Sequence, residues 1–206
     1  MRQGVINRRT KETDITISLN LDGEGKSEIS TGSGFFNHML ELFASHGRFD
    51  LKVRANGDTD VDFHHSAEDI GIVLGTAFKD NLGDKRGIKR YADIILPMDE
   101  ALILCALDFS GRSYLAYDVT LKATKLSDNG EEMSAIVGSF DTELVEEFLL
   151  AFVRSSGLTL HIKQLAGTNT HHILEGVFKA FARALREAVS YDEKFKSEIP
   201  STKGSL

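Results

Sequence analysis

The chain has little of several features that would narrow its class. It has a single cysteine, Cys105, so no disulfide can form within the chain. We expect this thiol to be buried and inert, because it lies in the apolar run Ala101–Leu107. Acidic residues outnumber Lys and Arg by 31 to 24, and the net charge of −7 argues against a nucleic-acid partner. A small anionic substrate needs only a few local cations and is compatible with this charge.

Long hydrophobic runs are also missing. No segment approaches the length that spans a membrane, and the N-terminal stretch has no apolar core of the kind found in signal peptides. We therefore expect a cytoplasmic protein without a membrane partner. The hydrophobic fraction of 41% and the charged fraction of 27% are ordinary for a globular protein. A length of 206 residues suffices for one larger domain or two small fused halves.

Hydrophobic periodicity predicts both strands and helices. Ile15, Ile17 and Leu19 alternate with polar residues, which is typical of a half-buried strand, here Asp14–Leu21. The expected helices are Phe36–Ser45 with Gly47 at its end, His64–Leu82 with Gly83 at its end, Asp141–Ser155 and His171–Val189. Further strands are expected over Phe49–Arg54, Ile88–Leu96, Ala101–Phe109, Ser113–Leu121 and Leu158–Leu165. The polar stretch Lys122–Ser134 is expected to be a loop.

The two halves of the chain have the same order of expected elements. Each gives strands, a helix, a glycine, a strand and then a helix that opens with His-His-x-x-Glu. Such repetition indicates an internal duplication. We therefore predict an α+β fold: an internally duplicated two-layer unit with mixed β-sheets and helices packed on one face. We expect one domain over residues 1–206, built of pseudo-repeats at about 1–87 and 88–190 and a C-terminal tail, 191–206.

The duplicated motif consists of His64, His65 and Glu68 in the first half, and His171, His172 and Glu175 in the second. Residues four apart lie on one face of a helix, so the first His and the Glu of each motif can chelate one ion. The second His points about 100° around the helix, toward a different ion. One metal would then bind His64, Glu68, His171 and Glu175, and a second would bind His65 and His172 with further ligands.

The further ligands follow from the pseudo-symmetry of the halves. His38, on the first helix of the first half, corresponds in position to Glu147 in the second half, so both are candidate metal ligands. Imidazole and carboxylate donors without thiolate favour manganese, iron or zinc, and the motif alone does not choose among them. His46, at the expected end of a helix, can instead stabilise the helix dipole, and His161 is a weaker catalytic candidate.

Other interpretations of the motif remain open from the residues alone. A single adjacent His pair is usually a surface or capping feature, but two copies at matched positions favour a ligand role. Two metals also activate water in dinuclear hydrolases, and a non-enzymatic metal store is a third reading. The Arg, Lys and Ser-Thr-Lys segments have no role in a metal store.

Several blocks, in order along nearly the whole chain, resemble the imidazoleglycerol-phosphate dehydratase family. The blocks are Phe35-Phe36-Asn37-His38-Met39-Leu40, the two His-His-x-x-Glu motifs, Pro97-Met98-Asp99-Glu100-Ala101, Asp108 to Leu115, Phe140 to Glu146, His172 to Ala180 and Ser201-Thr202-Lys203-Gly204. The resemblance implies manganese-dependent loss of water from imidazoleglycerol phosphate, giving imidazole acetol phosphate in histidine biosynthesis. It also implies a homo-oligomer of 24 subunits with active sites between neighbouring chains.

The resemblance also implies roles for individual residues. His64, Glu68, His171 and Glu175 are similar to ligands of one Mn²⁺, and His38, His65 and His172 to ligands of the other, with Glu147 at a position where many relatives have His. The implied substrate-binding residues, besides the imidazole–carboxylate cluster, are Glu12, His46, Arg90, Arg112, Lys179, Ser201, Thr202 and Lys203. We expect Glu12 to transfer the proton, with His46 as the alternative. Phe63 departs from the family, which commonly has Asp before the His pair, and Asn37 replaces a frequent Asp.

Overall fold

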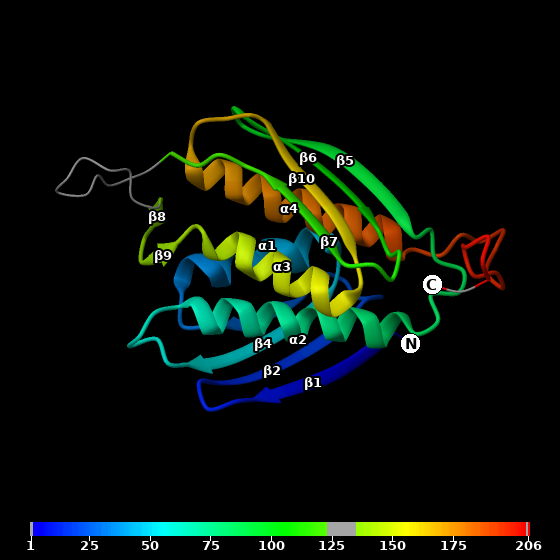
Figure 1. Cartoon of the computed structure of the whole chain (residues 1–206), viewed down its shortest axis with the longest axis horizontal. Helices are drawn as coiled ribbons and strands as arrows, with labels where there is room; N and C mark the ends of the chain where they lie inside the picture. The colour runs from blue at the N-terminus through cyan, green and yellow to red at the C-terminus, as the bar shows by residue number, and fades with distance from the viewer. Residues whose placement is uncertain (1, 123–134, 205) are drawn as a thin grey trace.

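A computed structural model describes residues 2–122, 135–204 and 206 of the chain. In it, four helices lie between two four-stranded β-sheets (Figure 1). The first sheet has the order β1-β2-β4-β3 and is followed along the chain by the second, with the order β5-β6-β10-β7. The strands of the first sheet are β1 (Gln3–Arg9), β2 (Thr13–Asn20), β3 (Ser27–Ser30) and β4 (Asp50–Gly57). The second sheet contains β5 (Tyr91–Met98), β6 (Ala101–Asp108), β7 (Tyr114–Asp118) and β10 (Thr159–Ala166).

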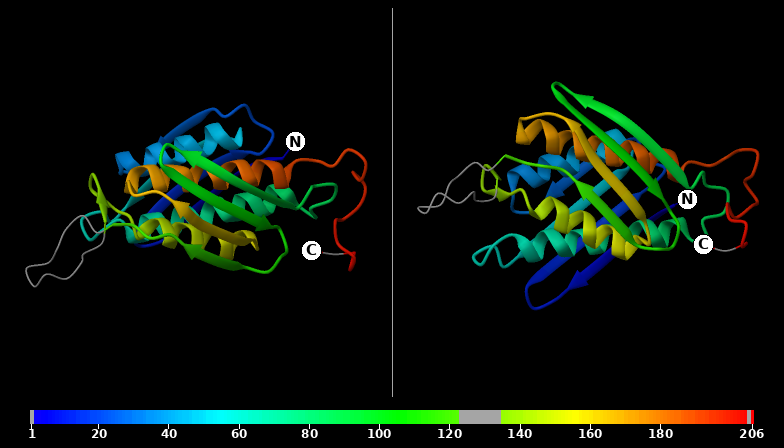
Figure 2. Two further views of the ribbon diagram at one scale, coloured as in Figure 1. Left: turned by 90° about the horizontal axis from the view of Figure 1, so that it is seen from above. Right: turned by 45° about the horizontal axis from the view of Figure 1, so that its top comes forward.

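Each sheet carries two helices on its inner face. Helices α1 (Gly34–Gly47) and α2 (His64–Leu82) pack on the first sheet, and α3 (Leu144–Ser156) and α4 (Thr170–Val189) pack on the second. The two helical layers meet where α2 contacts α3 and α1 contacts α4. The two views in Figure 2 show the second sheet lying across the helices on the side away from β1 and β2. A two-stranded ribbon, β8 (Ile136–Val137) with β9 (Phe140–Asp141), precedes α3.

The two halves have the same topology, as the repeated motif predicts. In each half the first two strands are antiparallel, the third strand is parallel to its neighbour, and one helix follows the third strand and another the fourth. The predicted α+β class, with mixed sheets that carry helices on one face, is confirmed. None of the described helices is long and apolar enough to cross a membrane.

The core lies between the helical layers and the inner faces of the sheets. Strand β2 shows how the sequence builds it, because Ile15, Ile17 and Leu19 are fully buried while the residues between them face outward. Phenylalanines fill the space among the helices, and their rings contact one another edge to face or stacked. The fully buried ones are Phe36, Phe43, Phe49, Phe78, Phe109, Phe140, Phe148, Phe152, Phe178 and Phe181. Cys105 is buried too, as expected, and burial raises the pKa of its thiol.

Two glycines allow α2 to approach α3 closely. A Cβ at Gly71 would lie 2.5 Å from the carbonyl oxygen of Phe148, and a Cβ at Gly75 would lie 2.5 Å from that of Phe152. Backbone cannot move away as easily as the end of a side chain, so only glycine fits at these positions. Because α2 carries the first His-His-x-x-Glu motif, this contact fixes the motif relative to the second half.

Several expected elements differ from the structure. Gly47 is the last residue of α1, and Arg48, with φ of 57°, takes the left-handed position that was predicted for the glycine. Gly47 is needed for space, because a Cβ there would lie 2.3 Å from the Phe49 ring. Helix α3 begins at Leu144, three residues later than predicted, because Phe140 and Asp141 pair with β8. Strand β1 was not predicted.

The remaining boundaries are close to the predictions. Helix α2 has the predicted bounds, and Gly83 follows it with a φ of 55°. Strand β5 begins at Tyr91 rather than Ile88, which forms an isolated bridge with Tyr191. The predicted loop Lys122–Ser134 lies outside the described residues except for its first residue.

Replacement of Gly71 by Ala should destabilise the protein by about 1–3 kcal/mol, because the added methyl group overpacks the contact between α2 and α3. Thermal and urea unfolding of the purified variant measure this. Gly34→Ala is the matched control, since a Cβ at Gly34 meets nothing within 4 Å and the residue lies in the first turn of α1. Equal unfolding midpoints for the two variants would contradict the tight contact.

Candidate active site

One imidazole–carboxylate cluster forms where α1 and α4 begin. The Nε2 atom of His171 lies 3.4 Å from Oε2 of Glu175, and Nε2 of His38 lies 4.0 Å from the same oxygen. His171 and Glu175 are four residues apart on α4, so the helix brings them onto one face. One ligand atom from each of the three residues lies within 4.8 Å of the others, and no other such group occurs among the described residues. This is a spacing that can hold a single metal ion.

Glu175 is the most buried member of the cluster. Its side chain is 11% exposed, and its second oxygen, Oε1, forms an ion pair with the ammonium group of Lys179 one turn later on α4. Burial raises the pKa of Glu175, but the hydrogen bond and charge of Lys179 and the imidazoles outweigh it, so the pKa is below its usual range. One oxygen therefore faces the imidazoles and the other is held by Lys179.

His172, the second histidine of the α4 motif, is oriented by a carboxylate from the turn between β5 and β6. Its Nδ1 lies 2.7 Å from Oε2 of Glu100, and the other Glu100 oxygen accepts hydrogen bonds from the amides of Thr168 and Asn169. The His172 hydrogen bond, followed by these amides, lowers the pKa of Glu100 to about 2. The same hydrogen bond raises the pKa of His172. Nε2 of His172 lies 3.7 Å from Oδ2 of the exposed Asp99, and with Nδ1 engaged it is the ring nitrogen that can bind a ligand.

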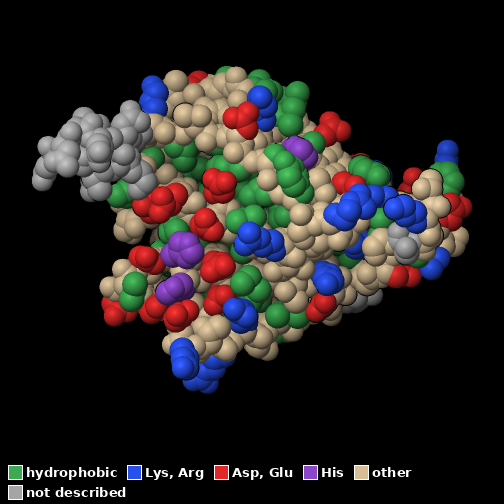
Figure 3. All heavy atoms as spheres, viewed as in Figure 1, with side chains coloured by type: hydrophobic (Ala, Val, Ile, Leu, Met, Phe, Trp, Pro, Cys, Tyr) green, Lys and Arg blue, Asp and Glu red, His purple; other side chains and the backbone are tan. Residues whose placement is uncertain are grey.

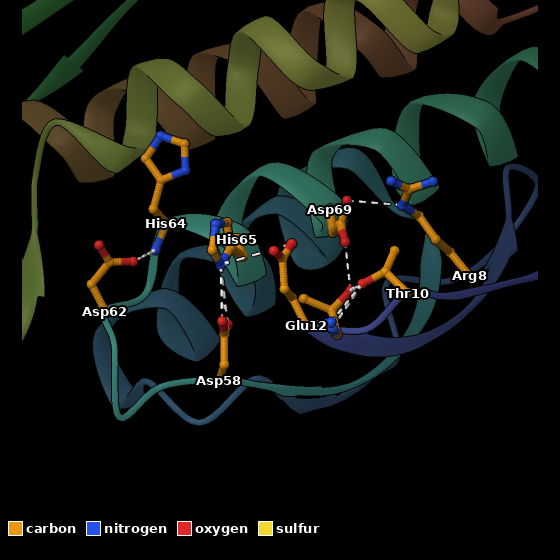
Figure 4. A network of polar contacts seen from close by, with 9 residues as sticks. Arg8, Thr10, Glu12, Asp58, Asp62, His64, His65 and Asp69 are labelled. Carbon is orange, nitrogen blue, oxygen red and sulfur yellow. Dashed lines mark hydrogen bonds and ion pairs between the residues drawn. The ribbon is translucent and has the colours of Figure 1, made fainter.

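His65, the second histidine of the α2 motif, is oriented in the same way by Asp58 (Figure 4). Its Nδ1 lies 3.0 Å from Oδ2 of Asp58 and 4.0 Å from Oε2 of Glu12, and the Asp58 hydrogen bond raises the pKa of His65. Asp62 accepts a hydrogen bond from the backbone amide of His64 at 2.7 Å, and the His64 ring points away from His65. Acidic and histidine side chains therefore gather where α2 begins, as the surface in Figure 3 also shows.

The family's common Asp before the His pair is replaced by Phe63, whose ring packs against Phe36 and Phe140. Asp58 contacts the imidazole of His65, whereas Asp62 accepts a hydrogen bond from the backbone amide of His64. Asn37, the other departure, accepts hydrogen bonds from the amide and hydroxyl of Thr31 at the start of α1.

Within one chain, the side chains that lie together differ from the predicted ligand sets. His38 lies with His171 and Glu175, whereas it was predicted to share an ion with His65 and His172. The reason is the helix pairing: α1 packs on α4, and α2 packs on α3. By the same pairing Glu147, in the first turn of α3, is on the helix that packs against α2 with His64 and Glu68. Those three do not converge as the first group does.

His46 lies further along α1, beside the middle of α4. Partial burial lowers the pKa of His46, and the charges of Lys179 and Arg183 lower it further, so its neutral imidazole is favoured. His38 lies beside Glu175, and His46 is eight residues later, beside Lys179 and Arg183. The two helices therefore run alongside each other with His46 about two turns from the cluster. His161 is exposed on the outer face of β10, with its ring against Tyr114.

Five other predicted substrate-binding residues line a second, positively charged cavity. A cavity of about 580 Å³ is lined by Arg90, Arg112, Ser201, Thr202 and Lys203, together with Tyr91, Ser110, Pro200 and Leu206. Arg90 is 8% exposed and donates to both oxygens of Asp108, at 2.7 and 3.1 Å, and to the carbonyl of Pro200 at 2.7 Å. Arg90 therefore anchors the tail, while Arg112 makes no ion pair with another described residue.

The cationic cavity and the imidazole cluster lie at opposite ends of α4. The amide of Arg90 donates to the carbonyl of Ala188, near the last residue of the helix, whereas His171 is in its first turn. Seventeen residues of helix separate Ala188 from His171, which corresponds to about 25 Å. In Figure 1 the C-terminal tail and the start of α4 are accordingly at opposite ends of the molecule.

Solved structures with this fold define the class of the protein. The chain superposes on the imidazoleglycerol-phosphate dehydratase of Staphylococcus aureus with a TM-score of 0.76 and 41% identity, covering 92% of this chain and 99% of that one. It superposes on the IGPD of Pyrococcus furiosus with a TM-score of 0.80 and 37% identity, covering 98% and 100%. The class is thus that of the carbon–oxygen lyases that eliminate water.

Sequence comparison gives the family. The family model of imidazoleglycerol-phosphate dehydratase matches residues 31–185. The imidazoleglycerol-phosphate dehydratase of Acetivibrio thermocellus is 54% identical over 205 residues, covering 100% of this chain and 99% of the relative, and that of Desulforamulus reducens is 55% identical, covering 100% and 98%. The chain belongs to the imidazoleglycerol-phosphate dehydratase family, and it is an enzyme, a hydro-lyase.

Sequence reasoning gave no role to Glu100, Asp58 and Asp69, which the structure connects to the site. Glu100 lies in one of the blocks that carry the family resemblance, which is a signal for it. Asp58 lies in a loop without periodicity, and Asp69 follows the first motif directly but has partners, Arg8 and Thr13, that only the fold brings to it.

Inorganic phosphate should bind in the cationic cavity, and Arg112→Ala should weaken this binding, because the free guanidinium is a planar donor suited to phosphate. The rise in thermal midpoint with phosphate concentration measures the affinity, and a loss of at least about tenfold is expected. Arg54→Ala, an exposed arginine on β4, is the control. Equal phosphate dependence in the wild type and the Arg112 variant would refute the site.

Proposed function

We propose that the protein converts imidazoleglycerol phosphate to imidazole acetol phosphate and water, as a step of histidine biosynthesis, with two Mn²⁺ ions per active site. The observation that carries the proposal is the convergence of His38, His171 and Glu175 in a member of this family. The substrate of this family carries an imidazole, which a dinuclear hydrolase does not require. A metal store would not require the cationic cavity.

The residues present fit manganese. Three donor atoms within 4.8 Å of one another, two imidazole nitrogens and one carboxylate oxygen, form a set that suits Mn²⁺, Fe²⁺ or Zn²⁺. His38, His171 and Glu175 would hold one ion, and His64, His65, Glu68, Glu147 and His172 are the candidates for holding the other. Bound manganese would supply a Lewis acid that stabilises the substrate imidazole in its anionic form.

The chain's own residues would bind the substrate and move the proton. Glu12 lies at the edge of the imidazole groups, 4.0 Å from His65, and is 56% exposed, so it can reach a substrate carbon and accept its proton. His46, whose pKa is lowered by burial and by two cations, is the alternative acceptor. Lys179, held against Glu175, places a positive charge beside the cluster.

The phosphate group of the substrate would bind in the cationic cavity, at the end of the molecule opposite the imidazole cluster. Arg90, Arg112 and Lys203 offer positive charge, and Ser201 and Thr202 offer hydroxyl donors, around one cavity. Arg90 is already engaged by Asp108, so its part is to hold the tail in place while Arg112 and Lys203 face the anion. A substrate the size of imidazoleglycerol phosphate cannot span about 25 Å within one chain.

The separation of the two parts supports an active site between neighbouring chains of a homo-oligomer, with 24 subunits as the family assembly. The outer face of the second sheet fits a second copy, because Tyr91, Ile95 and Leu165 are 56%, 56% and 44% exposed there. The outer face of the first sheet is polar along β2 and β4, so the two faces are not alike. In the second sheet, Tyr91, which follows Arg90, lies at one end of β5, and the turn with Glu100 lies at the other end.

Glu12→Gln should keep the bound manganese and lower kcat by about 10²- to 10⁴-fold, because the amide cannot accept the proton. Metal content is measured by elemental analysis and turnover by the absorbance of the enol or ketone product. Glu24→Gln, an exposed carboxylate paired with Lys26, is the control and should behave as wild type. A wild-type rate in the Glu12 variant would remove this residue from the mechanism.

A mixture of two inactive variants should regain activity. Glu175→Gln damages the imidazole cluster, and truncation after Pro200 removes the tail. If the two parts of each site come from different chains, co-assembly at equal amounts restores about one quarter of the sites. Turnover of the co-expressed mixture is compared with that of the separately purified variants. Sites built within one chain would give no recovery.

A further inference from the structure

Asp69 is a buried carboxylate with both oxygens engaged. It follows Glu68 on α2, is 6% exposed, and accepts from Arg8 Nε at 2.8 Å through one oxygen and from the Thr13 hydroxyl at 2.5 Å through the other. A buried carboxylate is stable only with such partners. Its partners come from β1 and β2, on either side of the turn that carries Glu12 (Figure 4).

The contact continues from Asp69 into that turn. The Thr13 hydroxyl lies 3.1 Å from the hydroxyl of Thr10, which accepts hydrogen bonds from the amides of Glu12 and Thr13, at 3.1 and 2.9 Å. Four groups are thereby joined in a chain of hydrogen bonds that ends at the backbone of Glu12. The conformation of residues 10–13 depends on Asp69 at one end of this chain.

The other side of the turn is held by the residue that orients His65. The carbonyl of Glu12 accepts a hydrogen bond from the amide of Asp58 at 3.1 Å, and the Asp58 carboxylate contacts His65. His65 and Asp69 are four residues apart, on one face of α2. One helical face thus positions both the imidazole and the Glu12 turn.

The second half of the chain has no equivalent of this carboxylate. In the α4 motif, the position that follows Glu175 is Gly176, where a Cβ would lie 2.9 Å from the side chain of the buried Ile103. His172 is oriented from the β5–β6 turn instead. A carboxylate at this position therefore occurs only in the half that carries Glu12. A general role in stabilising the motif would predict one in each half.

We propose that Asp69 is a positioning residue, which holds Glu12 beside His65 through Thr13 and Thr10. The proposal rests on the proton-transfer role assigned to Glu12 under the proposed function. Asp69 itself is buried, and both its oxygens are engaged by Arg8 and Thr13, so it would act through Glu12.

The first test is Asp69→Asn in the manganese-loaded enzyme, alone and combined with Glu12→Gln. An amide cannot accept from both Arg8 and Thr13, so kcat should fall at least about tenfold, with KM and metal content within about twofold of wild type. In the Glu12→Gln background the same change should alter the residual kcat by less than about twofold, because Glu12 is then no longer there to be positioned. An equal loss in both backgrounds would overturn the proposal.

Thr13 provides a second test that does not alter the buried charge. Thr13→Val keeps the shape and removes the hydroxyl, and Thr13→Ser keeps the hydroxyl. The Val variant should lose kcat as Asp69→Asn does, and the Ser variant should keep it. If only packing mattered, the order would be reversed. Asp14→Asn, an exposed carboxylate next to Thr13, is the matched control for charge and should keep wild-type kcat.

The outcomes separate this proposal from the function on which it rests. Glu12→Gln without activity and Asp69→Asn with wild-type kcat would overturn the positioning role and leave the proposed function standing. Wild-type kcat in Glu12→Gln would overturn the assignment of Glu12 itself.

Discussion

The direct packing of α2 on α3 is the contact on which the arrangement of the site depends. Gly71 and Gly75 let the two helices approach until backbone meets backbone, and this joins the two halves of the duplicated chain. Together with the pairing of α1 and α4, it decides which ends of the helices lie near one another. His38 thereby meets His171 and Glu175, residues from opposite halves. The cluster is a product of the interface between repeats and not of either repeat alone.

Helix polarity adds an electrostatic demand. Each His pair lies in the first turn of a helix, where the partial positive charge of the macrodipole disfavours a cation. Carboxylates from outside the helices offset it: Asp58 contacts His65, and Glu100 contacts His172 and the amides before α4. Both carboxylates contact Nδ1, so Nε2 is the nitrogen of each ring that can bind a cation. The surrounding loops therefore make the helix starts suitable for cation binding.

Local patterns in the sequence predicted much of the fold. The bounds of α2, the alternation of β2 and the duplication follow from periodicity and motif spacing, which act over a few residues. Strand β1 was missed because the adjacent apolar residues Val5 and Ile6 lie on opposite faces, Val5 exposed and Ile6 partly buried, so the sequence shows no clear alternation. Arg48 was missed because Gly47 is required by the Phe49 ring and not by backbone conformation.

The candidate site was predicted in part. The motif residues were evident because they repeat, but their grouping depends on helix pairing, which no local pattern encodes. Glu100 is joined to the second motif only by the fold, and Asp69, which follows the first motif directly, meets its partners Arg8 and Thr13 only in the fold. The separation of about 25 Å between Arg90 and His171 likewise follows from the length of α4 and the anchoring of Arg90 at its end.

Gly176 makes the two repeats unequal. Its tight contact with Ile103 leaves no room for a carboxylate at this position, so the second half cannot acquire the support that Asp69 gives in the first. Each repeat has an imidazole pair with an acidic turn beside it, which carries Glu12 in the first repeat and Glu100 in the second, but only the first turn is joined to a buried carboxylate of the motif helix. Each polypeptide would then contribute one reaction centre, with its second repeat specialised as a binding partner for the first.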